Sequence, residues 1–258
     1  MTEFYLLLVV AFVFGAVIGS FLNVCIYRIP AGKSVVSPPS SCPVCAHQIR
    51  WYENIPIFSY LFLLGKCSNC KSKISIRYPL IETLSGVLFV VVLYSFGFSL
   101  ATLVYWIFAA ALLTIAFIDL DHQIIPDVIS LPGVPVGLVC SFYVPWLSWS
   151  DSLYGILLGG GVLYAVAWLY QTLTKREGMG GGDIKLLAMI GAFLGWGAIF
   201  PIVFFASLAG TLIGLPLMLV KKEDSRLALP FGPFLASAAL VYLFWGADII
   251  AWYLSFYR

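Results

Sequence analysis

Apolar stretches of membrane-spanning length recur along nearly the whole chain, and this feature most constrains its fold. They lie at about 4–27, 80–98, 101–118, 127–147, 152–173, 184–200, 201–220 and 229–256. A helix needs about 20 apolar residues to cross a bilayer, and lipid admits only backbones that satisfy their own hydrogen bonds. With 62% hydrophobic and 10% charged residues, the sequence predicts an all-α polytopic membrane protein of about eight transmembrane helices.

The basic residues indicate how these helices are oriented. Every Lys and Arg except Arg258 falls in 28–79, 174–185 or 221–226, on one side of an eight-helix arrangement. The positive-inside rule makes that side cytoplasmic. The net charge of +2 is a by-product of this orientation, so we predict contact with membrane lipid and no nucleic-acid partner.

The hydrophilic segment divides the chain into three parts. The first segment has no basic region before it and is long enough to span, so we interpret it as a retained transmembrane helix (1–27) and not as a signal peptide. A cytoplasmic loop domain (28–79) follows, and the remaining seven helices (80–258) form the membrane core.

The cytoplasmic loop carries two CxxC pairs, Cys42 with Cys45 and Cys67 with Cys70, separated by 21 residues. This spacing is close to that of two-pair zinc sites, where four thiolates complete a tetrahedron and leave no open position for chemistry. A small loop with few large apolar residues gains folding free energy from such a metal. We predict structural Zn²⁺; two disulfides or a redox dithiol are the alternatives, which a reducing cytoplasm disfavours.

Carboxylates at cytoplasmic helix ends are the candidates for catalysis. In "FIDLDHQIIPD" (117–127), Asp119 ends one apolar helix, and in "GMGGGDIK" (178–185), Asp183 begins another on the same side. Ionisable groups at membrane depth are costly and usually functional. Two carboxylates brought together share a proton, so that one activates water while its protonated partner polarises a carbonyl. This is the chemistry of an aspartic protease, and such a pair titrates jointly.

Neighbouring residues are predicted to support this pair, although each has a simpler explanation. For Asp127 we favour a structural role in the first turn of the helix that it begins, and for Lys185 we favour the role of an orientation signal. A glycine run between helices is ordinarily a linker, but here it permits tight turns and close approach of a substrate strand. The supporting set is Gly178, Gly180, Gly182, Lys185, Asp121 and Asp127.

Five segments together resemble the type IV prepilin peptidases, a family of GxGD aspartic proteases. They are "GSFLNVCIYRIP" (19–30), "SCPVC…YENIPIFSYLFLLGKCSNC" (41–70), "IRYPLIE" (76–82), "IDLDHQIIPD" (118–127) and "GMGGGDIKLLA" (178–188). The resemblance implies a bifunctional enzyme of the bacterial inner membrane that serves type IV pili and type II secretion. Such an enzyme removes the basic leader of prepilins or pseudopilins after a glycine on the cytoplasmic face, then N-methylates the new terminus with S-adenosylmethionine.

By position, the resemblance makes Asp119 and Asp183 the catalytic pair and the four loop cysteines the zinc ligands. The methyl donor lacks an evident nucleotide fold, so its site is expected in the membrane helices and the cytoplasmic loop. Glu82, Asn23 and Arg28 are the candidates to line it, with helix packing, capping or orientation as alternative roles. Two other functions stay open: an intramembrane aspartic protease without methyltransferase activity, and a proton-coupled transporter gated by the carboxylates.

Overall fold

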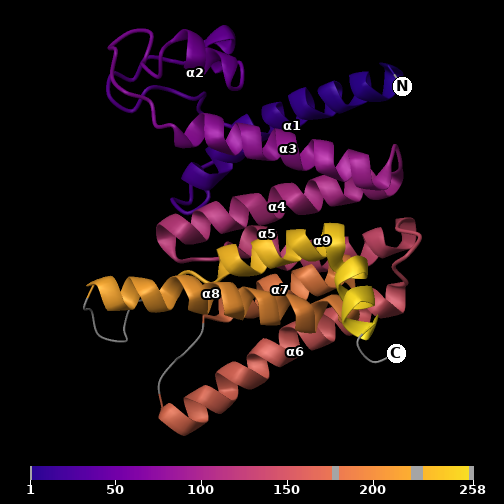
Figure 1. Cartoon of the computed structure of the whole chain (residues 1–258). Coiled ribbons are helices and arrows are strands. Elements are labelled where there is room, and N and C mark those ends of the chain that lie inside the picture. Colours follow the sequence, from indigo (N-terminus) through magenta and orange to yellow (C-terminus); the bar gives the residue numbers. More distant parts are fainter. Residues whose placement is uncertain (1, 176–179, 222–228, 256–258) are drawn as a thin grey trace. The chain divides into compact units, whose positions relative to one another are not determined.

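The chain folds into α-helices in a computed structural model that describes residues 2–175, 180–221 and 229–255 (Figure 1). No β-strand occurs in these ranges; two isolated bridges pair Ser41 with Gln48 and Lys66 with Lys73. The chain forms two compact units, residues 1–114 and 115–258. The all-α class predicted from hydropathy is confirmed.

Each of the eight predicted apolar segments forms a helix. They are α1 (Thr2–Arg28), α3 (Arg77–Phe96), α4 (Leu100–His122), α5 (Asp127–Cys140), α6 (Trp149–Thr174), α7 (Gly181–Leu194), α8 (Ile199–Lys221) and α9 (Gly232–Ser255). Among the described residues, six of these, namely α1, α3, α4, α6, α8 and α9, are long and apolar enough to cross a membrane. The chain is therefore a multi-pass membrane protein.

Two helices are shorter than the apolar runs that predicted them. At 14 residues each, α5 and α7 extend about 21 Å, less than the hydrocarbon core of about 30 Å. After α5 the chain enters the 3₁₀ turn Ser141–Tyr143. Gly195 ends α7 with φ +79°, and the 3₁₀ turn Trp196–Ala198 then leads into α8. Gly195 thus separates two helices that hydropathy alone leaves nearly continuous.

Helices α1 and α3 pack against each other in the first unit, and the cysteine-containing loop joins their adjoining ends (Figure 1). The loop contains the 3₁₀ turn η1 (Trp51–Asn54) and the short helix α2 (Phe58–Phe62). The first part of α4 completes this unit: the Trp106 ring stacks on Phe89 at 4.9 Å between centroids, and its indole N–H donates to the Phe89 carbonyl. Many apolar side chains of α1 are exposed, as expected of a helix that faces lipid.

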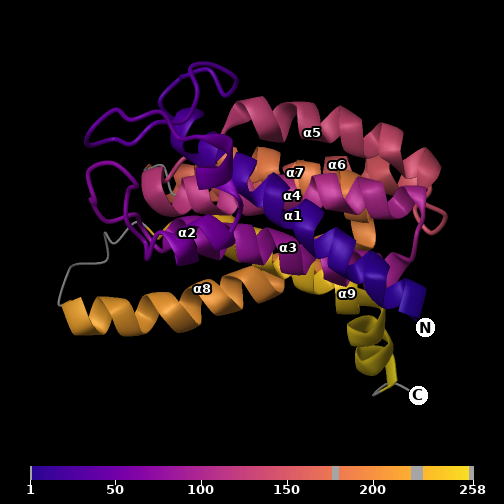
Figure 2. The same cartoon turned by 90° about the horizontal axis from the view of Figure 1, so that it is seen from above.

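Helix α7 is the most enclosed element of the second unit, where it packs against α5, α6 and α9 (Figures 1 and 2). Seven of its residues are buried. Its contact with α6 depends on glycine: a Cβ placed on Gly155 would lie 2.8 Å from the carbonyl carbon of Gly191 and closer still to its oxygen. The buried Ser152 hydroxyl adds a hydrogen bond of 2.7 Å to the Ala192 carbonyl. Small residues of this kind let membrane helices approach backbone to backbone.

Candidate active site and thiolate cluster

Asp119 lies in the last turn of α4, where the helix is brought to an end by its own backbone. Gln123 adopts a left-handed conformation with φ +53°, and its N–H donates to the Asp119 carbonyl at 2.8 Å. Pro126 then caps α5. The Asp119 side chain is 5% exposed, so the end of the helix carries a carboxyl group into the interior of the second unit.

Asp183 lies in the first turn of α7, in the same unit. Gly180 caps this helix, and its carbonyl accepts the Asp183 N–H at 3.3 Å. Asp183 precedes the buried part of α7 and lies outside the six long apolar helices. Burial, followed by the charge of Asp119, raises the pKa of Asp183 to about 6. The two carboxylates predicted from the membrane edge therefore interact electrostatically.

A third residue reaches Asp119 that the sequence analysis did not identify. The backbone N–H of Gly232, the first residue of α9, donates to Asp119 Oδ2 at 2.9 Å. The contact joins positions 113 residues apart. The only local signal is a glycine between Phe231 and Pro233 at the start of an apolar helix, and this pattern is equally typical of an ordinary helix start.

Asp127 and Lys185 pair with each other. The Lys185 ammonium lies 2.8 and 2.9 Å from the two Asp127 carboxylate oxygens, and both side chains are more than a third exposed. Asp127 occupies the first turn of α5 as predicted. The ion pair connects the starts of α5 and α7 at the surface, so the Lys185 charge is committed to Asp127.

The remaining members of the predicted supporting set differ in their surroundings. Asp121 is exposed on α4. Gly182 lies against Ile125, where a Cβ would be 2.9 Å from the Ile125 Cβ. Gly178 lies outside the described residues. The described part of the glycine motif therefore packs against the connection between α4 and α5, close in sequence to Asp119.

The four loop cysteines form one cluster in the first unit. Their sulfur atoms all lie within 4.8 Å of one another. Cys42 Sγ is 3.8 Å from Cys70 Sγ, and Cys45 Sγ is 3.9 Å from Cys67 Sγ. A tetrahedral Zn²⁺ with Zn–S bonds of about 2.3 Å separates its sulfurs by about 3.8 Å. None of the four is in a disulfide, and the cluster has the dimensions of a four-thiolate metal site.

Each CxxC pair is held by the same backbone hydrogen bonds. Cys42 N–H donates to the His47 carbonyl and Cys67 N–H to the Ser72 carbonyl, at 2.9 and 2.8 Å. Ala46 and Lys71 take the same left-handed turn, with φ +57° and +60°. Backbone N–H groups of Cys45 and Val44 lower the pKa of the Cys42 thiol to about 6, which favours the thiolate that a metal requires.

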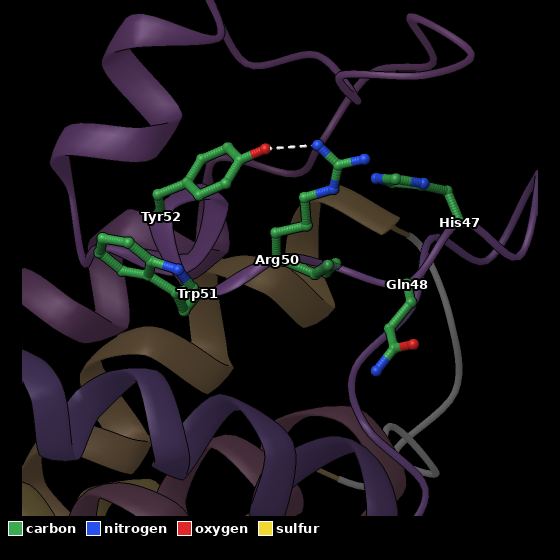
Figure 3. A pocket seen from close by; sticks show the side chains of 6 residues that line it. His47, Gln48, Arg50, Trp51 and Tyr52 are labelled. Atoms are coloured by element: carbon green, nitrogen blue, oxygen red, sulfur yellow. Dashed lines mark hydrogen bonds between the residues drawn. The ribbon is translucent and has the colours of Figure 1, made fainter.

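A hollow of about 580 Å³ lies in the same loop, lined by the continuous run His47–Tyr52 (Figure 3). The Arg50 guanidinium donates to the Tyr52 hydroxyl at 2.6 Å. Glu53 bonds both the Arg50 N–H, at 2.9 Å, and the His47 ring, at 3.2 Å. The Arg50 N–H most strongly, then the Ser68 side chain and the His47 ring, lower the pKa of Glu53 to about 2. The conformation of the run is thus held by the Arg50 side chain and by Glu53, the residue that follows the run.

The three residues predicted to line a methyl-donor site also hold the first unit together. Asn23 donates to the Tyr78 carbonyl at 3.2 Å. Arg28 donates to the carbonyls of Ser34 and Pro38, at 3.0 and 2.7 Å. The buried Glu82 carboxylate accepts the Ile57 N–H at 2.7 Å. Each side chain therefore has a partner within the fold, in agreement with the packing role that was the alternative.

Fold and site together define a multi-pass membrane protein with a buried and a half-buried carboxylate at helix ends of the second unit, and a four-thiolate cluster in the first unit. This class includes membrane aspartic peptidases. Residues 13–96 match the Bacterial Peptidase A24 N-terminal domain, and residues 106–215 match the Type IV leader peptidase family. The chain belongs to the type IV leader peptidase family. No solved structure matches it.

Relatives that match most of this chain support this assignment. A protein of Stutzerimonas stutzeri is 40% identical over 96% of this chain and 94% of its own length. One of Pseudomonas aeruginosa is 38% identical over 94% and 91%, respectively. A protein of Myxococcus xanthus is 40% identical over 81% of this chain and 62% of its own length. All three are named prepilin leader peptidase/N-methyltransferase.

Proposed function

We propose that this protein cleaves the basic leader from type IV prepilins or pseudopilins after a glycine, then methylates the new N-terminal amine with S-adenosylmethionine. The observation that carries the proposal is the electrostatic interaction of Asp119 with Asp183 in a chain of the type IV leader peptidase family. The names of relatives that match nearly the whole chain support both activities.

The carboxylate pair performs the cleavage in this proposal. Asp119 is buried and Asp183 is half-buried, and burial together with the charge of Asp119 raises the pKa of Asp183 to about 6, which favours a proton shared by the pair. One carboxylate takes a proton from water as the water attacks the scissile carbonyl, and the protonated partner donates a hydrogen bond to the carbonyl oxygen. Collapse of the tetrahedral intermediate returns a proton to the leaving amine.

The substrate is presented from the membrane. We propose that the hydrophobic helix after the cleavage site lies against the apolar helices, while the basic leader stays in the cytoplasm. Glycine at the cleavage point allows the extended backbone to approach the pair. The distribution of Lys and Arg supports an inner-membrane protein with a cytoplasmic active site.

The four cysteines would hold structural Zn²⁺. Their sulfur separations fit a tetrahedral ion, and four thiolates leave no coordination position for substrate. When bound, the ion would supply folding free energy to the loop between α1 and α3 and no chemistry. This supports our division of the chain into a helix (1–27), a zinc domain (28–79) and a membrane core (80–258).

Methyl transfer is proposed to use the first unit. Asn23, Arg28 and Glu82 are retained as candidates, although their partners in the fold support a structural role equally well. Glu82→Gln distinguishes the two: loss of methylation with cleavage retained supports donor binding, and loss of both supports a structural role.

Mass spectrometry of a co-expressed prepilin tests the whole proposal. The wild-type protein should yield a shortened and singly methylated pilin. Asp119→Asn and Asp183→Asn should each leave the leader in place, and Asp248→Asn, which changes an exposed carboxylate on α9, should behave as wild type.

The same measurement separates the other two functions. Cleavage without methylation would indicate an intramembrane protease that lacks the second activity. An intact prepilin with the wild-type protein would refute the proposal and return attention to transport, which the family assignment does not favour.

A further inference from the structure

The start of α9 contacts Asp119 through its backbone. Gly232 N–H donates to Asp119 Oδ2 at 2.9 Å, and both residues are buried. Both belong to the second unit. The bond reaches one carboxylate oxygen only, so the contact is directional: it fixes which oxygen faces α9 and leaves the other oxygen for a different partner.

Glycine is needed at this position because the backbone lies against the carboxyl group. A Cβ on Gly232 would lie 2.7 Å from Asp119 Oδ2, 3.2 Å from its Cγ and 3.3 Å from its Cβ. Ordinary contacts between such atoms are about 3.5–4.0 Å. Any side chain at this position must therefore displace Asp119 or the start of α9.

The Gly232 N–H can donate to Asp119 because it lies at the start of α9. The first N–H groups of a helix have no partner within the helix, and the next residue, Pro233, has no N–H. The Phe231 carbonyl already accepts the N–H groups of Phe234 and Leu235. The helix start also carries a positive partial charge, which favours an anion beside it.

The two carboxylates of the pair differ in the hydrogen bonds that they accept. Asp119 accepts the Gly232 N–H, whereas no donor from the described residues reaches the Asp183 carboxylate. A hydrogen bond from an N–H favours the ionised form of a carboxyl group. The charged group that faces Asp119 from α7 is Asp183, and Lys185 on the same helix is paired with Asp127.

We propose that Gly232 is a positioning residue for the peptidase reaction: its N–H orients Asp119 and keeps it as the ionised member of the pair. Asp119 then acts as the base toward water, and Asp183 carries the shared proton. The inference rests on the proposed function and deepens it, because it gives the two carboxylates of the proposed pair different roles.

Two replacements at position 232 test this inference. Gly232→Ala adds the Cβ that collides with Asp119, and glycolic acid in place of glycine, incorporated by suppressor tRNA, deletes the N–H without adding a side chain. Gly210→Ala on α8 is the control, because its Cβ would make only an ordinary contact, 3.7 Å from the Phe234 ring. Each protein is assayed for prepilin cleavage against pH and for methylation of an already cleaved pilin.

We expect both replacements to lower cleavage about tenfold or more, the size of a lost hydrogen bond to a charged group. The acid limb of the pH–rate profile should move to higher pH by about one unit, while methylation of the already cleaved pilin matches the control. Unchanged cleavage and an unchanged profile in the ester variant would overturn the inference. Equal loss of cleavage and methylation in both variants would also overturn it, because the role would then be purely structural.

Failure of the inference is distinguishable from failure of the proposed function. If the wild-type protein leaves the prepilin intact, the proposed function fails. If the wild-type protein cleaves and the variants at position 232 do so with the same rate and profile, only the role of Gly232 fails.

Discussion

The close contact between α6 and α7 is expected to fix the position of Asp183 at the start of α7. The substitution Gly155→Ala tests this, because it forces the two helices apart. The added Cβ would lie 2.8 Å from the Gly191 carbonyl carbon, about 1 Å inside an ordinary contact. The neighbours are backbone atoms, which cannot rotate away, so the two helices must separate. Overpacking of this kind costs about 1–3 kcal/mol, and the better helix propensity of alanine offsets up to about 1 kcal/mol.

The net expectation is a loss of about 1–2 kcal/mol, or about tenfold in the ratio of folded to unfolded protein. Gly161→Ala is the matched control on the same helix, because nothing described lies within 4 Å of its added Cβ. Thermal unfolding in detergent micelles compares the two, and prepilin cleavage reports whether Asp183 has moved with α7. If the Gly155→Ala protein is as stable and as active as the Gly161→Ala protein, the close helix contact does not position the site.

Three further predictions concern charge and metal. Asp183→Asn should be more stable than wild type at pH 7 by on the order of 1–3 kcal/mol, because the pKa of Asp183 is raised to about 6 from an ordinary value of 3.8. The folded state holds this proton more tightly, so wild-type stability falls as pH rises from about 4 to 6; the variant, followed by thermal unfolding against pH, should lack this slope. Lys185→Ala should lower the free energy of unfolding by less than about 1 kcal/mol and change cleavage little, since its ion pair with Asp127 is exposed. A large loss of cleavage would show that Lys185 takes part in the active site. Chelation, or Cys42→Ser, should expose the loop to limited proteolysis while the helices stay in the membrane; an unchanged digestion pattern would argue against a structural metal.

The sequence predicted features that depend on local pattern. Hydropathy located all eight helices, because apolar composition over about 20 residues is read along the chain without tertiary information. The CxxC spacing predicted one cluster of four thiolates, because two short turns of that form bring sulfur pairs to one point. The positions of Asp119 and Asp183 at helix ends predicted that the two carboxylates act as a pair, and the effect of the Asp119 charge on the pKa of Asp183 supports this proposal.

Features that depend on tertiary contacts were not predictable in the same way. The bond from Gly232 to Asp119 joins positions 113 residues apart, and the ion pair of Lys185 with Asp127 joins positions 58 apart. The periodic pattern of apolar residues predicts single helices and does not predict contacts between residues so far apart in the sequence. The early end of α7 is a local feature that hydropathy also missed, since it depends on the left-handed Gly195 in an otherwise apolar run.

The hydrogen bond between α9 and Asp119 also determines which residues a shortened version of the peptidase must keep. The match to the Type IV leader peptidase family ends at residue 215, before α9 begins at Gly232. A fragment cut where that similarity ends would keep both aspartates and lose the backbone group that holds one of them. On the role proposed for Gly232, a shortened peptidase would need another donor to Asp119 in place of this N–H.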